Sequence, residues 1–185
     1  VTVTDTLAGN IYNGGYGIYR MRVNGNITNN GVIKDDYDTD GVLNADDLEL
    51  LITGNIINNG KWECNFTTLI GNATQTIYQS AGKMFDGYLT YLGSSSELVA
   101  QSDITVTKDL GLNNVILQMN NNKLNVNRWL TNGTINNCVL NNGRLQNIIS
   151  QNNLILTGTV TVDINNIFHG SVTVQDTLQS NEYGG

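Results

Sequence analysis

Two stretches of the chain nearly repeat each other: Val23-Asn-Gly-Asn-Ile-Thr-Asn-Asn-Gly31 returns further on as Ile52-Thr-Gly-Asn-Ile-Ile-Asn-Asn-Gly60. In both, apolar β-branched residues are interleaved with polar ones, which is typical of a strand, and the Asn-Asn-Gly step that follows tolerates the positive φ of a tight turn. Similar units recur along the chain, as at Ile104-Thr-Val-Thr107 and Val172-Thr-Val-Gln175. Short strands with turns every ~8–12 residues indicate an all-β protein.

Two all-β architectures compete, an antiparallel sandwich and a β-solenoid in which the chain winds in stacked coils. Internal repeats favour the solenoid, and at ~20–25 residues per coil residues 1–185 form one domain of about seven to nine coils. The 30 Asn residues fit this prediction, because stacked Asn side chains can hydrogen-bond from coil to coil. The absence of Pro fits as well, since Pro removes a ladder donor.

The acidic residues are concentrated in one place. The net charge is −7, and seven of the 16 acids lie between Asp35 and Glu49 with no base among them, so the rest of the chain carries nine acids and nine bases. A block of like charges is costly unless a cation neutralises it, which makes this segment a candidate cation site. The acidic balance argues against nucleic-acid binding, and no apolar run approaches the ~20 residues of a membrane helix.

The acidic segment contains the pattern Asp36-Tyr-Asp38-Thr-Asp40-Gly41-Val42-Leu43-Asn44-Ala45-Asp46-Asp47. It fits a twelve-residue calcium loop of the form D-x-D-x-D-G-x5-acid. We therefore predict a Ca²⁺ site within an insertion at residues 35–51 that ends in a short helix at about 45–51. The predicted ligands are the three leading carboxylates, a backbone carbonyl, an amide and the closing carboxylate: Asp36, Asp38, Asp40, Val42, Asn44 and Asp47.

Two family resemblances sharpen these expectations. The loop resembles the calcium repeat of dockerin domains, which also closes on Asp and runs into a Leu-rich helix, although a dockerin carries two such repeats and this chain has one. The run from Gly71 to Leu124, with Gly71-Asn-Ala-Thr-Gln-Thr-Ile77 and Ser102-Asp-Ile-Thr-Val-Thr107, resembles repeats of large secreted Bacteroidetes surface proteins. That resemblance implies a right-handed parallel β-helix, export, and an adhesive or structural role, and it carries over no catalytic residues.

Other chemistry is sparse. The single His169 and the lack of a nucleophile motif give no support to a hydrolase triad, and nothing pairs Asp86, Asp103, Asp109 and Asp163 as glycoside hydrolysis requires, so we expect no enzyme. Cys64 and Cys138 fall about three coils apart, which predicts free, buried thiols rather than a disulfide. The Tyr residues at 12, 16 and 19 are predicted to form either a platform for sugar stacking or protein contact, or aromatic packing over the first coil or a cap.

These observations predict an extracellular or cell-surface module, a segment or subunit of a fibre or stalk stabilised by calcium. Its expected partners are copies of itself or adjacent repeats stacked end to end, because the motif Val1-Thr-Val-Thr-Asp-Thr-Leu7 returns as Val172-Thr-Val-Gln-Asp-Thr-Leu178. Surface glycans are a further candidate partner. The alternative is a carbohydrate-binding or polysaccharide-degrading β-helix module.

Overall fold

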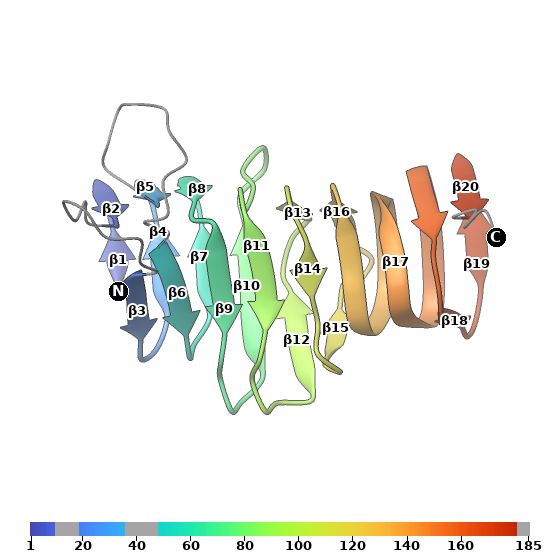
Figure 1. Cartoon of the computed structure of the whole chain (residues 1–185), viewed down its shortest axis with the longest axis horizontal. Helices are drawn as coiled ribbons and strands as arrows, with labels where there is room; N and C mark the ends of the chain where they lie inside the picture. The colour runs from blue at the N-terminus through green and yellow to red at the C-terminus, as the bar shows by residue number, and fades with distance from the viewer. Residues whose placement is uncertain (10–18, 36–47, 181–185) are drawn as a thin grey trace.

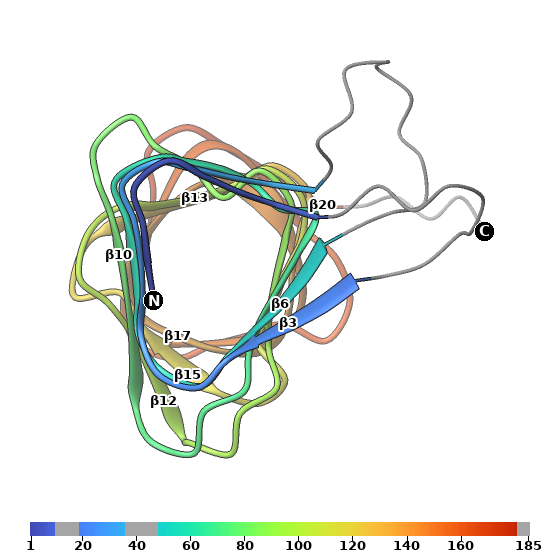
Figure 2. The same ribbon diagram turned by 90° about the vertical axis from the view of Figure 1, so that its left-hand side faces the viewer.

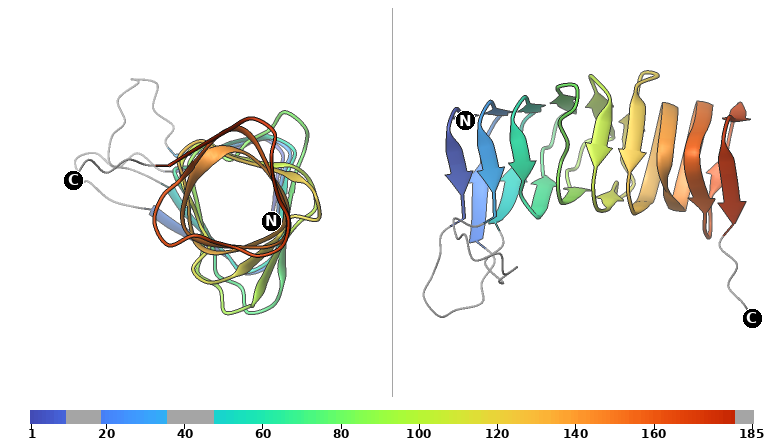
Figure 3. Two further views of the ribbon diagram at one scale, coloured as in Figure 1. Left: turned by 90° about the vertical axis from the view of Figure 1, so that its right-hand side faces the viewer. Right: turned by 90° about the horizontal axis from the view of Figure 1, so that it is seen from above.

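The computed structural model describes residues 1–9, 19–35 and 48–180, and this part of the chain is all-β. Every strand pairing within it is parallel. Seventeen strands belong to one sheet and three to another. The ribbon follows a roughly closed outline when seen end-on (Figure 2), and it advances along one axis from the N-terminal to the C-terminal end (Figure 3).

Each circuit of the chain, here called a coil, has three sides. The first side begins with β1 (Thr2–Val3) and continues through β4 (Ile27–Asn29), β7 (Ile56–Asn58), β10 (Gln75–Gln79), β12 (Glu97–Ala100) and β15 (Ile116–Gln118). The second side contains β2 (Thr6–Ala8), β5 (Val32–Lys34), β8 (Lys61–Glu63), β13 (Ile104–Val106) and β16 (Lys123–Val126), with Phe85 bridging β8 to β13. The third side contains β3 (Tyr19–Val23), β6 (Leu48–Ile52), β9 (Phe66–Leu69), β11 (Tyr88–Tyr91) and β14 (Leu110–Gly111).

The C-terminal coils continue the same path with fewer interruptions. All three sides run into β17 (Trp129–Val162), a continuous stretch that bends around the axis (Figure 1). The last coil consists of β18 (Ile167–Phe168), β19 (Val172–Val174) and β20 (Thr177–Ser180), each paired with β17.

The coil length shrinks from the first coils to the middle of β17 and returns to 18 residues between β17 and the last coil, as the strand pairings and the hydrogen bonds between side chains of neighbouring coils show. Asn29 and Asn58 are separated by 29 positions, of which twelve belong to segment 36–47. The separation is 21 between Asn59 and Ser80, 18 between Gln118 and Asn136, and 16 between Asn125 and Asn141. The predicted length of ~20–25 residues per coil therefore holds in the middle of the chain and is too long near the C-terminal end.

Asparagine corners explain the short coils. Within β17 every fifth residue from 132 to 152 is an Asn with φ between 48° and 63°: Asn132, Asn137, Asn142, Asn147 and Asn152. Asn tolerates this left-handed conformation better than other residues with a Cβ, so one residue suffices to turn the chain from one side to the next. Three five-residue sides give a coil of 15 residues, which is the spacing of the hydrogen bond from Asn147 Nδ2 to Asn132 Oδ1, at 2.9 Å.

The interior is mainly apolar, and some of its buried polar side chains hydrogen-bond to one another. Inward residues such as Ile27, Leu50 and Leu140 are fully buried. Asn29 and Asn58 are also buried, and Asn29 Nδ2 donates to Asn58 Oδ1 at 3.0 Å. The predicted ladder of Asn side chains from coil to coil is confirmed, and it lets these buried amides stay hydrogen-bonded.

The predicted helix at 45–51 is wrong over its described part. Residues 48–52 form β6, whose inward residues Leu48, Leu50 and Ile52 are buried while Glu49 and Leu51 are half-buried. An alternation of period two suits a strand, and β6 is hydrogen-bonded between β3 and β9. Parallel neighbours on both sides therefore override the helical preference of the Leu-rich segment.

Candidate functional site

All six predicted calcium ligands lie outside the described residues. Asp36, Asp38, Asp40, Val42, Asn44 and Asp47 belong to the segment 36–47. Within residues 1–9, 19–35 and 48–180, no three His, Cys, Asp or Glu side chains are grouped so that they could hold a metal ion. The calcium site therefore stays a prediction, and the structure bears on it through the residues on either side of segment 36–47.

Those flanking residues are joined by Asp35. Its Oδ1 accepts a hydrogen bond from Leu48 N at 3.2 Å, and its two oxygens accept from Asn65 N at 2.8 and 2.9 Å. The carboxylate thereby links the residue before segment 36–47 to the first residue after it and to the next coil. We call Asp35, Leu48, Cys64 and Asn65 the loop base.

Cys64 completes the loop base from the interior. Its buried Sγ lies 3.0 Å from Leu48 O and 3.3 Å from Phe66 O. Burial, and secondarily the nearby Asp35 carboxylate, raises the pKa of the Cys64 thiol to about 12. Burial alone raises the pKa of Cys138 to about 12. The prediction of two free, buried cysteines is confirmed, and both act as small apolar groups rather than nucleophiles.

The four acids weighed for glycoside hydrolysis each have a partner of their own. Asp86 accepts from Thr107 Oγ1 at 2.6 Å, and Asp103 accepts from Lys123 N at 2.8 Å. Asp109 Oδ1 lies 3.6 Å from Arg128 Nε, and Asp163 Oδ2 lies 3.8 Å from Arg144 Nη2. Nothing in these contacts joins two of the carboxylates into the facing pair that glycosidases use.

A row of aromatic and basic side chains follows the outer surface of the third side. The rings of Phe66 and Tyr88 stack with centroids 5.4 Å apart, Lys108 Nζ lies 5.1 Å from the Tyr88 centroid, and Arg128 Nη1 donates to Tyr88 Oη at 3.2 Å. Further along, the Arg144 guanidinium lies 4.1 Å from the Trp129 centroid. Because these rings are already contacted by one another and by cations, the row stabilises the stacking of coils and is a poor platform for sugars.

The remaining candidates from the sequence contribute little. The side chains of Tyr12, Tyr16 and Tyr19 lie outside the described part of the structure. His169 is exposed and follows Phe168 in the last coil, where its backbone N donates to Ser150 O.

A groove beside β10 is a feature that the sequence does not predict. The segment between β10 and β11 projects beyond its neighbours (Figure 1), and a hollow of about 480 Å³ lies between it and strands β13 and β16. The sequence signals for it are weak: the Ala81-Gly82 step, which breaks the strand pattern, and the neighbouring Asp103.

Comparisons with known proteins give no match. No family model, no curated protein and no solved structure matches the chain. Within the described residues there is no helix long and apolar enough to cross a membrane.

Proposed function

We propose that the chain is a structural or adhesive module of a cell-surface fibre or stalk, built as a right-handed parallel β-helix and acting without catalysis. Parallel pairing at every described strand supports the helical path. Seen from the end that carries β1, the ribbon runs clockwise as it recedes (Figure 2), which is the sense of a right-handed coil. A rod of stacked coils, each contacting only its neighbours, suits a part that spans distance.

The observation that carries this proposal is the exposed inward face of the last described coil. In parallel pairs the two partners point to the same side of the sheet, so Val172, Val174 and Leu178 point inward like their partners Leu154, Leu156 and Val160. The three partners are at most 1% exposed, whereas the three residues of the last coil are 40–46% exposed. Among the described residues, nothing covers the inward side chains of this coil.

This edge also lacks the features with which proteins protect exposed strands. Residues 164–180 contain no Lys, Arg or Pro, and Asp176 is their only acid. Edge strands that stay unpaired commonly carry such residues, since a bare edge invites pairing. The natural occupant is another parallel coil of the same construction, from an adjacent repeat or a second copy of the chain, and head-to-tail contacts of this kind give filaments.

Sedimentation velocity over a range of protein concentrations tests the proposal, with negative-stain images of the same samples. We expect end-to-end association that grows with concentration. Val174→Lys places a charge on the uncovered interior and should abolish association, whereas Thr173→Lys, on the outer face of the same strand, should leave it nearly unchanged. Equal effects of the two variants would contradict the proposal, and a chain that stays monomeric at every concentration would rule out a second copy of the chain as the occupant of this edge.

We also propose that Ca²⁺ binds segment 36–47 and stabilises the first coils. The loop base supports this, because the Asp35 carboxylate accepts hydrogen bonds from Leu48 N and Asn65 N and so fixes the two points at which segment 36–47 leaves and rejoins the coils. Binding energy at a site that forms only with the metal becomes folding energy. Calorimetric titration with Ca²⁺, together with melting in Ca²⁺ and in EDTA, should show one site and a higher melting temperature with the metal. Asp38→Ala should remove both effects.

The export that this function requires is a separate expectation. Antibodies raised against the chain should label intact cells of the source organism, and labelling only after permeabilisation would count against a surface role. The polysaccharide-degrading alternative has little support, since each of four carboxylates contacts a partner of its own and none of these contacts joins two of them: Asp86, Asp103, Asp109 and Asp163. Binding a glycan without cleaving it needs no such carboxylate pair and requires only a groove.

A further inference from the structure

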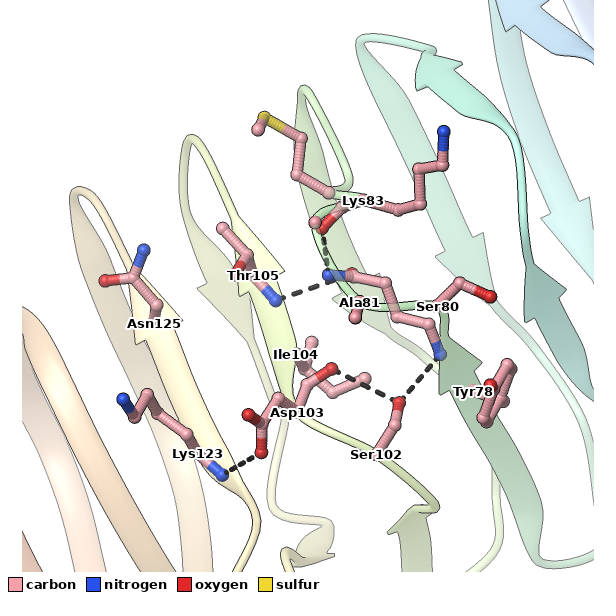
Figure 4. A pocket seen from close by; sticks show the side chains of 13 residues that line it. Tyr78, Ser80, Ala81, Lys83, Ser102, Asp103, Ile104, Thr105, Lys123 and Asn125 are labelled. Atoms are coloured by element: carbon pink, nitrogen blue, oxygen red, sulfur yellow. Dashed lines mark hydrogen bonds between the residues drawn. The ribbon is translucent and has the colours of Figure 1, made fainter.

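We propose that the groove beside β10 binds a neutral oligosaccharide. Its wall is the segment 80–84, and its floor and far side come from the next two coils, at residues 102–105 and 123–125. Figure 4 shows residues of these three segments around the hollow. The groove therefore crosses stacked coils, which repeat every ~4.8 Å and offer a ligand regularly spaced polar groups.

The groove is held in shape by Gln79. This side chain is buried, and its Nε2 donates to Lys83 O while its Oε1 accepts from Thr105 N. Its backbone N donates to Ser102 Oγ at 2.8 Å, and Lys83 N donates to Ser80 O at 3.0 Å to close the turn. A wall fixed in this way costs little ordering entropy when a ligand binds.

The side chains around the groove are mixed in a way that suits sugars. Asp103 offers a carboxylate whose Oδ1 accepts from Lys123 N, Lys123 offers an ammonium group, and Asn125 offers an amide. Hydroxyl groups both donate and accept, so a polyhydroxylated ligand can satisfy all three. Tyr78 and Met84, which as residues are 36% and 43% exposed, supply apolar surface for the C–H face of a sugar ring.

Charge decides between neutral and acidic sugars. In Figure 4 the Lys83 ammonium group points away from Asp103 and Lys123. The Lys123 ammonium group also points away from the Asp103 carboxylate in this view. A uronate placed beside Asp103 would therefore meet like charge, whereas a neutral sugar would not. The lining includes a single carboxylate, Asp103, so the two-carboxylate chemistry of glycoside cleavage is not available there and the ligand is bound intact.

The test is a titration of the ¹⁵N-labelled full chain with cellotetraose, mannotetraose, xylotetraose, chitotetraose and trigalacturonate, followed by amide chemical shifts. We expect at least one neutral sugar to shift amides within residues 78–84, 102–105 and 123–125. Tyr78→Ala should weaken that binding about three- to tenfold, the usual range for one aromatic contact. Ile57→Ala should leave it unchanged, because Ile57 holds the same register position one coil earlier and lies outside the groove.

Asp103→Asn separates recognition from folding. It keeps an oxygen that can accept from Lys123 N, so the melting temperature should stay near that of the wild type while the affinity for the neutral sugar falls. The proposal is overturned if no neutral sugar shifts these amides at millimolar concentration, if only trigalacturonate does, if the shifts lie elsewhere, or if Ile57→Ala weakens binding as much as Tyr78→Ala.

Discussion

Replacing Asp35 by Ala should destabilise the N-terminal coils markedly. The carboxylate accepts from two backbone donors, Leu48 N and Asn65 N, which belong to different coils. Leu48 and the adjacent Cys64 are buried, so water can replace the lost acceptor only partly. A hydrogen bond to a charged group contributes ~1.5–3 kcal/mol, and two such bonds, reduced for partial solvation, give an expected loss of about 3 kcal/mol in the free energy of unfolding.

Urea denaturation followed by circular dichroism measures this loss, with each variant examined in Ca²⁺ and in EDTA. Asp35→Asn keeps one acceptor oxygen without the charge and should lose roughly half as much. The matched control is Asp5→Ala, because Asp5 is exposed and the hydrogen bond that it accepts from Thr6 Oγ1 is 3.3 Å long. Its effect should stay within ~0.5 kcal/mol. If Asp35→Ala proves as stable as Asp5→Ala, Asp35 does not hold the loop base together.

Three other features of the coils make testable predictions. A Cβ added at Gly60 would lie 2.1 Å from Gly31 O, so Gly60→Ala should lower the free energy of unfolding by at least ~3 kcal/mol or prevent folding. A Cβ added at Gly111 would have its nearest atom 3.7 Å away, so Gly111→Ala should be neutral or slightly stabilising in the same denaturation assay. Burial raises the pKa of the Cys138 thiol from 9.0 to about 12, so between these pH values the thiol ionises only in the unfolded chain. As the pH rises from 9 to 12, the free energy of unfolding should therefore fall by ~1.4 kcal/mol per pH unit for this thiol. Cys138→Ala should make that decline shallower. Asn147 has φ of 54° and hydrogen-bonds to Asn132 and Asn165, so Asn147→Ala should lower the melting temperature more than Asn147→Gly, which keeps the left-handed corner and loses only the ladder.

The strand pattern could be predicted from the sequence because successive coils place the same kinds of residue at the same positions. Ile27, Ile56 and Ile77 are paired in turn through parallel strands, and the two copies of the opening repeat lie directly against each other. The buried Asn29 and Asn58 follow from the same register. The repeat in the sequence therefore predicts the parallel stacking of like residues.

The coil length and β6 could not be predicted in the same way. A coil as short as the one from Asn132 to Asn147 depends on a single Asn in the left-handed conformation at each corner, and composition does not show which of the many Asn residues take that conformation. The Leu and acid content of the segment after the acidic block favours a helix. Its strand geometry depends instead on β3 and β9, which belong to the coils before and after it.

The groove is beyond sequence reasoning for a related reason. Its lining comes from three coils, and Tyr78, Asp103 and Lys123 are far apart in the chain, so only the register of β10, β13 and β16 brings them together. Outward residues are also free of the packing constraints that make inward positions regular. Their chemistry gives no periodic signal.

The coils turn through two kinds of corner, a single Asn or a longer projecting segment, and the two leave different outer surfaces. Where one Asn turns the chain, as at Asn142 and Asn147, no residues are left to project, and the outer surface follows the coil. Where the corner is longer, as between Gln79 and Phe85, side chains stand out from the coil and enclose hollows on both sides of the projecting segment. Recognition is therefore expected in the middle coils and rigid spacing in the tight coils of β17. Deleting one coil from β17, such as residues 133–147, should shorten the rod yet leave the groove intact, whereas replacing residues 80–84 by a tight turn should abolish the groove and preserve the rod.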